Sequence, residues 1–204
     1  MARVTHVKSA RVSKKPRICI SCGHEVQPKE SYKYVELKTG PYSSITRAWC
    51  ATCVPKQSQL TANGRMSTLY GCQEALEDAV SLFQKGGMEI SDLEVEFESQ
   101  ADEADSVADE YEESIAAMPD GLQQSSQAEE MQSKADAIHE WAEVLRGVNW
   151  PEFDPDACAE CDGDRDDPLH DENVEEEYDH DFEEPQIGDV DISEAVAAIG
   201  ELGI

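Results

Sequence analysis

The sequence predicts a mainly α protein in which a small β-hairpin head with four cysteines precedes an antiparallel three-helix or coiled-coil body and a disordered acidic tail. Three observations predict this architecture: two CxxC pairs near the N-terminus, apolar residues at helical spacing in the middle, and crowded carboxylates after residue 150. The chain has 204 residues and a formal net charge of −29. Leu, Ile, Val and Phe supply only 38 of these residues, a share too small for one large core.

Basic and acidic residues are distributed unevenly along the chain. Residues 1–65 contain 12 of the 16 Lys and Arg residues and three acidic ones, whereas residues 66–204 contain four basic and 42 acidic residues. Such a charge difference between segments says more about partners than the overall pI does. It indicates a basic head on an acidic body, with a basic arm over residues 1–17 and a folded unit over residues 18–57.

Two cysteine pairs enclose the predicted head. Strand-like runs over residues 31–37 and 42–49 lie between them and are joined by a Thr39-Gly40-Pro41 turn. Two CxxC knuckles on a hairpin supply the closed shell of four thiolates that a structural zinc requires. In a reducing compartment such pairs are more often metal ligands than disulfides. We therefore predict a head that resembles a zinc ribbon or a treble clef and binds one structural Zn²⁺ ion through Cys19, Cys22, Cys50 and Cys53.

Three amphipathic segments follow the head within residues 58–148. Their apolar residues recur three and four positions apart over residues 69–83, 90–118 and 128–145. Short glycine-containing turns separate these segments, so neighbouring helices are expected to run antiparallel with their apolar stripes facing each other. We predict a helical hairpin or bundle, whose stripes would also allow self-association between chains.

The last quarter of the chain is predicted to have little fixed structure. Residues 149–191 are dominated by carboxylates and predict a disordered acidic tail, because such a composition cannot build a core. The final segment, residues 192–204, has apolar residues at helical spacing and is interpreted either as a short docking helix or as a weak apolar end. Within the tail, Cys158 and Cys161 form a lone CxxC pair, which is either an unordered pair of thiols or a second metal site.

Several features together resemble a family of tailed-bacteriophage proteins. They are the opening MARVTHVKSAR, the two CxxC pairs, the KQSQLT segment over residues 56–61 and the acidic helices. The resemblance extends to about residue 150. It implies a phage-encoded protein that acts in the cytoplasm of a bacterial host, and the family has no established activity to carry over.

The head combines cations with aromatic side chains, which suits contact with a macromolecule. Lys and Arg attract phosphates, and aromatic rings on a small sheet can stack on bases. Nucleic acid and a host protein both fit as the partner, and the alternative is that the aromatic rings only shield the zinc. The candidate contact residues are Arg11, Lys14, Lys15, Arg17, Lys33, Tyr34, Arg47 and Trp49.

We expect a non-enzymatic phage accessory protein that binds a host protein or nucleic acid through its zinc head and acidic helical body. The acidic body repels phosphate, which makes a nucleic-acid partner harder to accommodate. The alternative is therefore an acidic nucleic-acid mimic that inhibits a host DNA-binding or defence protein, because helices can hold dense carboxylates on a rigid frame.

Other classes of protein are disfavoured by what the sequence lacks. It has no glycine-rich phosphate loop, nucleophile elbow or HExxH motif, and its five histidines are scattered, so we do not expect an enzyme. No apolar run approaches the roughly 18–20 residues that a membrane span needs. The opening residues have no signal-peptide core, and we expect a cytoplasmic location.

Overall fold

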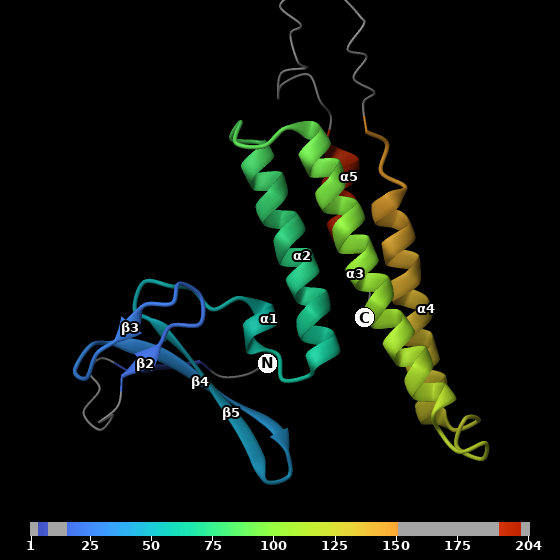
Figure 1. Ribbon diagram of the computed structural model, residues 1–204, viewed down its shortest axis with the longest axis horizontal. Coiled ribbons are helices and arrows are strands. Elements are labelled where there is room, and N and C mark those ends of the chain that lie inside the picture. Colours follow the sequence, from blue (N-terminus) through green and yellow to red (C-terminus); the bar gives the residue numbers. More distant parts are fainter. Residues whose placement is uncertain (1–3, 8–15, 151–191, 201–204) are drawn as a thin grey trace, which may run out of the picture.

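A β-rich head and a helical body make up the structure, a computed structural model that describes residues 4–7, 16–150 and 192–200. Figure 1 shows the small sheets of the head on one side and the long helices of the body on the other. The predicted fold class is confirmed, because antiparallel helices follow small N-terminal sheets that carry the cysteine cluster. Most of the predicted basic arm, and all but the first two residues of the predicted acidic tail, lie outside the described residues.

The described part of the head contains two antiparallel sheets. In the larger sheet the strand order is β1 (Thr5–Val7), β4 (Tyr32–Gly40) and β5 (Ser43–Cys50). In the smaller sheet β2 (Arg17–Ile18) pairs with β3 (Glu25–Val26). The β4–β5 hairpin agrees with the two strand-like runs of the sequence. The other strands have only two or three residues each, which is too short for an alternating pattern to reveal them.

The register of the β4–β5 hairpin decides which side chains it buries. Lys33 lies opposite Trp49, and Val35 lies opposite Arg47. Residues opposite each other share a face of the sheet, so these four side chains project to the same side. Val35 and Trp49 are buried there. The segment that leads through α1 (Gln57–Leu60) covers this face, because Arg47 and Trp49 both donate hydrogen bonds to it.

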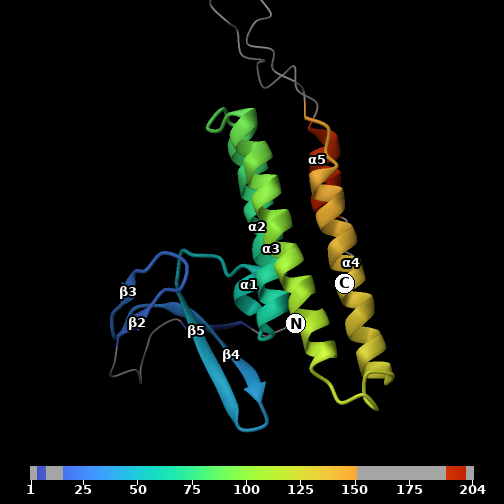
Figure 2. The same ribbon diagram turned by 45° about the vertical axis from the view of Figure 1, so that its right-hand side comes forward.

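Three long helices form the body: α2 (Gly64–Phe83), α3 (Ile90–Ala116) and α4 (Ser126–Arg146). They run antiparallel in succession, and α3 packs against both of its neighbours (Figures 1 and 2). Polar side chains start two of them: the Asn63 side chain accepts a hydrogen bond at the beginning of α2, and Ser125 does the same for α4. Among the described helices, none is both long enough and apolar enough to cross a membrane.

The apolar stripes of the three helices meet in one core. Phe97 of α3 is 1% exposed, and its ring packs edge-on against Trp150, with the ring centroids 5.1 Å apart. Ala101 and Ala104 of α3 and Ala135 of α4 are fully buried. Small side chains at these positions let helices approach closely, because the spacing between helix axes depends on the residues at the contact.

A short fifth helix, α5 (Ser193–Ile199), packs on both α2 and α4, and Figure 2 shows it beside α4. Ala198 is buried, and its carbonyl oxygen accepts a 3.0 Å hydrogen bond from the indole Nε1 of Trp141 in α4. The carbonyl oxygen of Ile199 accepts a longer bond, 3.4 Å, from the side chain of Gln73 in α2. Residues far apart in the sequence therefore join the body, and the C-terminal carbonyls of α5 are satisfied by side chains of two other helices.

We predict that Phe97→Ala destabilises the body by about 3–5 kcal/mol, because it leaves a cavity and removes the contact with Trp150. Val95→Ala is the matched control, since Val95 lies on the same helix but is 63% exposed, and it is expected to change stability by less than about 0.5 kcal/mol. Urea unfolding followed by far-UV circular dichroism measures both values. Equal effects of the two substitutions would contradict the described core.

Candidate metal centre

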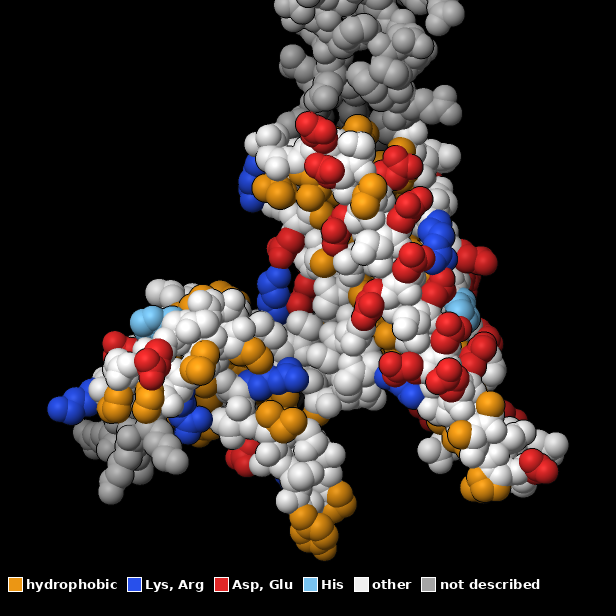
Figure 3. Space-filling model, viewed as in Figure 1, with side chains coloured by type: hydrophobic (Ala, Val, Ile, Leu, Met, Phe, Trp, Pro, Cys, Tyr) orange, Lys and Arg blue, Asp and Glu red, His pale blue; other side chains and the backbone are white. Residues whose placement is uncertain are grey.

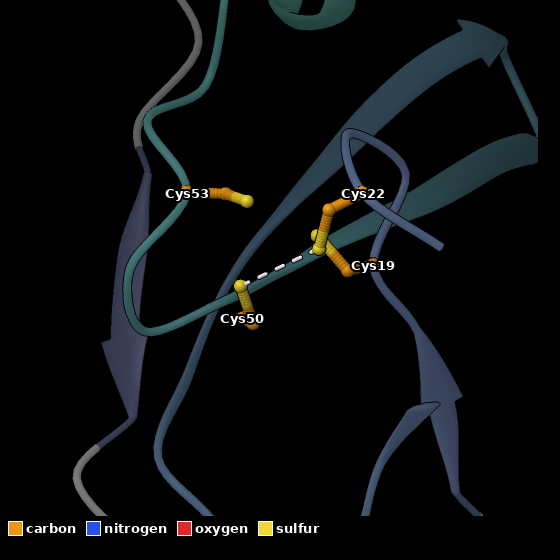
Figure 4. Close-up of side chains that lie close together, drawn as sticks. All are labelled: Cys19, Cys22, Cys50 and Cys53. Atoms are coloured by element: carbon orange, nitrogen blue, oxygen red, sulfur yellow. Dashed lines mark hydrogen bonds between the residues drawn. The ribbon is translucent and has the colours of Figure 1, made fainter. Parts of the chain in front are cut away.

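The four cysteines of the two CxxC pairs converge at one point of the head. Cys19 and Cys22 come from the loop between β2 and β3, Cys50 is the last residue of β5, and Cys53 follows three positions later. All four sulfur atoms lie within 4.8 Å of one another. The Sγ atoms of Cys22 and Cys50 are 3.8 Å apart, and Figure 4 shows the side chains of both pairs pointing toward a shared centre.

The sulfur geometry fits a tetrahedral metal ion. Metal–sulfur bonds of about 2.3 Å in a tetrahedral shell place sulfur atoms about 3.8 Å from each other. The separation between Cys22 and Cys50 equals this value. It is far longer than a disulfide bond of about 2.05 Å, and all four cysteines are free thiols. The four side chains are therefore positioned to hold one metal ion.

The first knuckle is shaped by its backbone. The Gly23 amide donates a 2.9 Å hydrogen bond to the Cys19 carbonyl, and the Cys19 amide donates a 2.8 Å bond to the His24 carbonyl. Gly23 has a φ of +70°, a left-handed conformation that glycine adopts without steric cost. The turn that brings Cys22 back toward Cys19 thus depends on the glycine that follows the CxxC motif.

The electrostatics of the cluster favour a bound cation. A hydrogen bond with the Thr52 hydroxyl, at 3.1 Å, lowers the pKa of the Cys50 thiol to about 6. A hydrogen bond to Cys50 raises the pKa of the Cys53 thiol to about 12. Neighbouring thiolates repel each other, so the cluster cannot ionise fully without a cation, and a metal that takes four thiolates removes this conflict.

Three of the predicted contact residues bind the chain that follows the cysteines. The Lys33 ammonium donates a 2.7 Å hydrogen bond to the Cys53 carbonyl, and the Arg47 guanidinium donates to the Ser58 and Gln59 carbonyls. Trp49 is 0% exposed and donates its indole N–H to the Gln59 side chain at 2.7 Å. The predicted stacking role does not fit Trp49, because the strand register places its ring on the covered face of the hairpin.

Two of the remaining predicted contacts, Arg17 and Tyr34, lie within the described residues, and both lie beside the Tyr32 ring. Arg17 stacks over the Tyr32 ring at 5.5 Å, and the rings of Tyr32 and Tyr34 are 6.0 Å apart. Strand alternation puts Tyr34 on the face of β4 opposite to that of Lys33. The other three predicted contacts lie outside the described residues: Arg11, Lys14 and Lys15.

The head is also joined to the body by side-chain contacts that the sequence did not predict. Glu74 of α2 accepts two hydrogen bonds from Ser58, one from the backbone amide at 3.0 Å and one from the hydroxyl at 2.5 Å. Lys56 forms a 2.6 Å ion pair with Asp78 one turn further along α2. No local sequence pattern reveals such pairs, because their partners lie 16 and 22 positions apart on different elements.

The other cysteines are not part of this centre. Cys72 is buried in the helical body, where burial raises the pKa of its thiol to about 11, in agreement with a small core residue. The CxxC pair of Cys158 and Cys161 lies outside the described residues, so a second metal site there stays a prediction.

Comparison with known proteins finds no matching family model, no matching curated protein and no matching solved structure. The resemblance to tailed-bacteriophage proteins therefore stays a prediction from the sequence. The metal centre rests on the positions of its four sulfur atoms and needs no relative to support it.

We predict that Cys50→Ser reduces the metal content of the purified protein from about one ion per chain to near zero, because three thiolates no longer close the shell. Cys72→Ala is the matched control: it also removes one cysteine but leaves the cluster intact, and it should retain the ion. Inductively coupled plasma mass spectrometry after exhaustive dialysis measures both. A full equivalent of metal in the Cys50→Ser protein would refute the assignment of these ligands.

Proposed function

We propose that the chain is a non-enzymatic accessory protein that binds a macromolecule, with a zinc ion that organises its head and an acidic helical body that offers the binding surface. Four cysteine thiolates at tetrahedral spacing are the ligand set of structural zinc sites. Such a shell has no open position for water or substrate, so the ion supports folding and takes no part in catalysis.

The acidic face of α3 is the observation that carries this proposal. A helix of 27 residues is about 40 Å long, and this one carries a carboxylate about every 3.7 Å of its axis. Figure 3 shows Asp and Glu side chains spread over α3. The acidic face is made of Asp92, Glu94, Glu96, Glu98, Asp102, Glu103, Asp105, Asp109, Glu110, Glu112 and Glu113.

Three of the six Lys and Arg residues within residues 16–57 are engaged by carbonyls or carboxylates of the protein. Lys33 and Arg47 bind backbone carbonyls, and Lys56 forms an ion pair with α2. Arg65 at the start of α2 stacks on Tyr111 and pairs with Glu110 of α3. These contacts argue against a phosphate-binding head and favour a partner with a basic surface, which the potential of the acidic face would attract.

A nucleic-acid mimic is the second candidate function, and the charge spacing of α3 favours it. One strand of duplex DNA has a phosphate about every 3.4 Å of helix axis, close to the carboxylate spacing along α3. A DNA-binding or defence protein of a bacterial host would meet a similar density of negative charge along a rigid helix. If the chain is phage-encoded, this encounter takes place in the host cytoplasm.

Affinity capture with the tagged full-length chain separates these functions. We expect a bacterial lysate to yield a basic protein that is retained after nuclease treatment. Added duplex DNA should displace that protein if the chain is a mimic, and should leave it bound if the acidic face has another kind of partner. Recovery that disappears with nuclease would instead indicate nucleic-acid binding through the head.

We predict that the triple variant Glu94→Gln, Glu98→Gln and Glu113→Gln weakens binding of the captured protein by at least about tenfold, because it removes three exposed charges from α3. A control variant with the same change of charge on α4 should bind within about twofold of the wild type; it replaces Glu129, Glu140 and Glu143 with Gln. Isothermal titration calorimetry measures the dissociation constants. Equal losses in both variants would show that net charge, rather than α3, determines binding.

A further inference from the structure

A histidine and two carboxylates meet on the surface of the body, away from the cysteine cluster. Asp109 and Glu112 lie one turn apart on α3, and His139 faces them from α4. Their ligand atoms lie within 4.8 Å of one another. We propose that Asp109, Glu112 and His139 form a second metal site, which binds a divalent first-row transition metal such as Zn²⁺ between the two helices.

The orientation of His139 supports this site. Its Nδ1 lies 2.7 Å from the Asp105 carboxylate, which only accepts, so Nδ1–H is the donor; in the neutral form of the ring Nε2 carries the lone pair that a metal needs. Nε2 points toward Glu112, whose nearest carboxylate oxygen is 3.9 Å away. In protein metal sites, a histidine that binds the metal through one ring nitrogen commonly donates its other ring N–H to a carboxylate, as His139 does to Asp105.

Asp105 is itself held in place. The Arg146 guanidinium contacts its second carboxylate oxygen at 2.7 Å and reaches Asp102 at the same distance. One oxygen of Asp105 therefore remains available to His139 while the other is bound by a cation from the same helix, α4. Asp105 is a positioning residue in this arrangement, and it does not reach the ion.

The distance between His139 and Glu112 leaves room for an ion and is too long for a direct hydrogen bond. At 3.9 Å, Nε2 of His139 and the Glu112 oxygen are beyond hydrogen-bond range. Tetrahedral zinc with bonds of about 2.0–2.2 Å places nitrogen and oxygen ligands about 3.4 Å apart, so a small movement of the Glu112 carboxylate lets one ion bridge the two atoms. Asp109 is exposed and has no hydrogen bond or ion pair within the described residues, which leaves its carboxylate free to close on the ion by a change of rotamer.

The local charge also favours a cation. Within the described part of the chain, no Lys or Arg pairs with Asp109 or Glu112. Imidazole with carboxylate ligands suits zinc and related transition metals, whereas magnesium and calcium prefer oxygen ligands alone. Three protein ligands leave at least one position for water or for a ligand from a partner. The site shares Asp109 and Glu112 with the acidic face, but its test does not depend on the macromolecule binding proposed above.

Long-range ¹H–¹⁵N spectra of the imidazole rings test the proposal in the full-length protein, with its head already loaded with zinc. The chain has five histidines, and His139→Gln assigns the His139 signals by their disappearance. We expect added Zn²⁺ to shift the Nε2 resonance of His139 and leave its Nδ1–H in place. Because the readout belongs to one residue, zinc bound by cysteines or histidines elsewhere does not obscure it.

Two matched pairs of variants complete the test. Glu112→Gln should weaken zinc binding at His139 by at least about tenfold. Glu113→Gln removes the same charge at the next position and should change the zinc affinity by less than twofold. Asp105→Asn should weaken binding by about 10–100-fold and disturb the His139 tautomer. Asp102→Asn also removes a partner of Arg146, but it should change neither the zinc affinity nor the His139 tautomer. An unshifted His139 resonance on zinc addition, or equal effects within either pair, would overturn the proposal.

Discussion

The meeting of four sulfur atoms at one point is the constraint on which the head depends. A unit of this size has few apolar residues to bury, and its described core is one cluster of eight buried residues that includes Val35, Leu37 and Trp49. A metal that closes the shell joins the loop after β2 to the end of β5, and in small domains this binding energy is largely folding energy. Because Cys50 ends β5, the same constraint fixes where the chain leaves the sheet and where residues 53–60 begin to cover it.

From this point a continuous series of polar contacts leads to the body. Trp49 and Arg47 on the hairpin hold Gln59 and its neighbours, and Ser58 in the same segment holds Glu74 of α2. The segment is too short to have a core of its own, so its shape comes from these partners on both sides. The head is consequently not an independent module on a free linker, because the covering of its sheet and its attachment to α2 use the same few residues.

The charges of the body serve two different purposes. A few carboxylates are used internally, as in the pairs of Arg65 with Glu110 and of Arg146 with Asp102 and Asp105, which tie neighbouring helices together at the surface. Pairs as exposed as these contribute little to stability individually. Within the part of the chain that the structure describes, most carboxylates of α3 have no Lys or Arg partner, and their mutual repulsion is a cost that the apolar seam of the bundle must offset. Such a cost is understandable if the surface meets cations, either a metal or a basic partner.

Local spacing by itself determined the helical body, the hairpin and the four metal ligands, because CxxC knuckles and amphipathic stripes need only neighbours within a turn or a strand. Tertiary structure decided the features that depend on contacts between residues far apart in the sequence. The pairing of β4 with β5 and the chain that covers this hairpin buried Trp49, which no count of basic and aromatic residues could reveal. The pairing of α3 with α4 placed His139 beside carboxylates more than 25 positions away. Helical periodicity tells which side of a helix is buried, whereas the choice of the facing helix and its offset follows only from packing all the elements together.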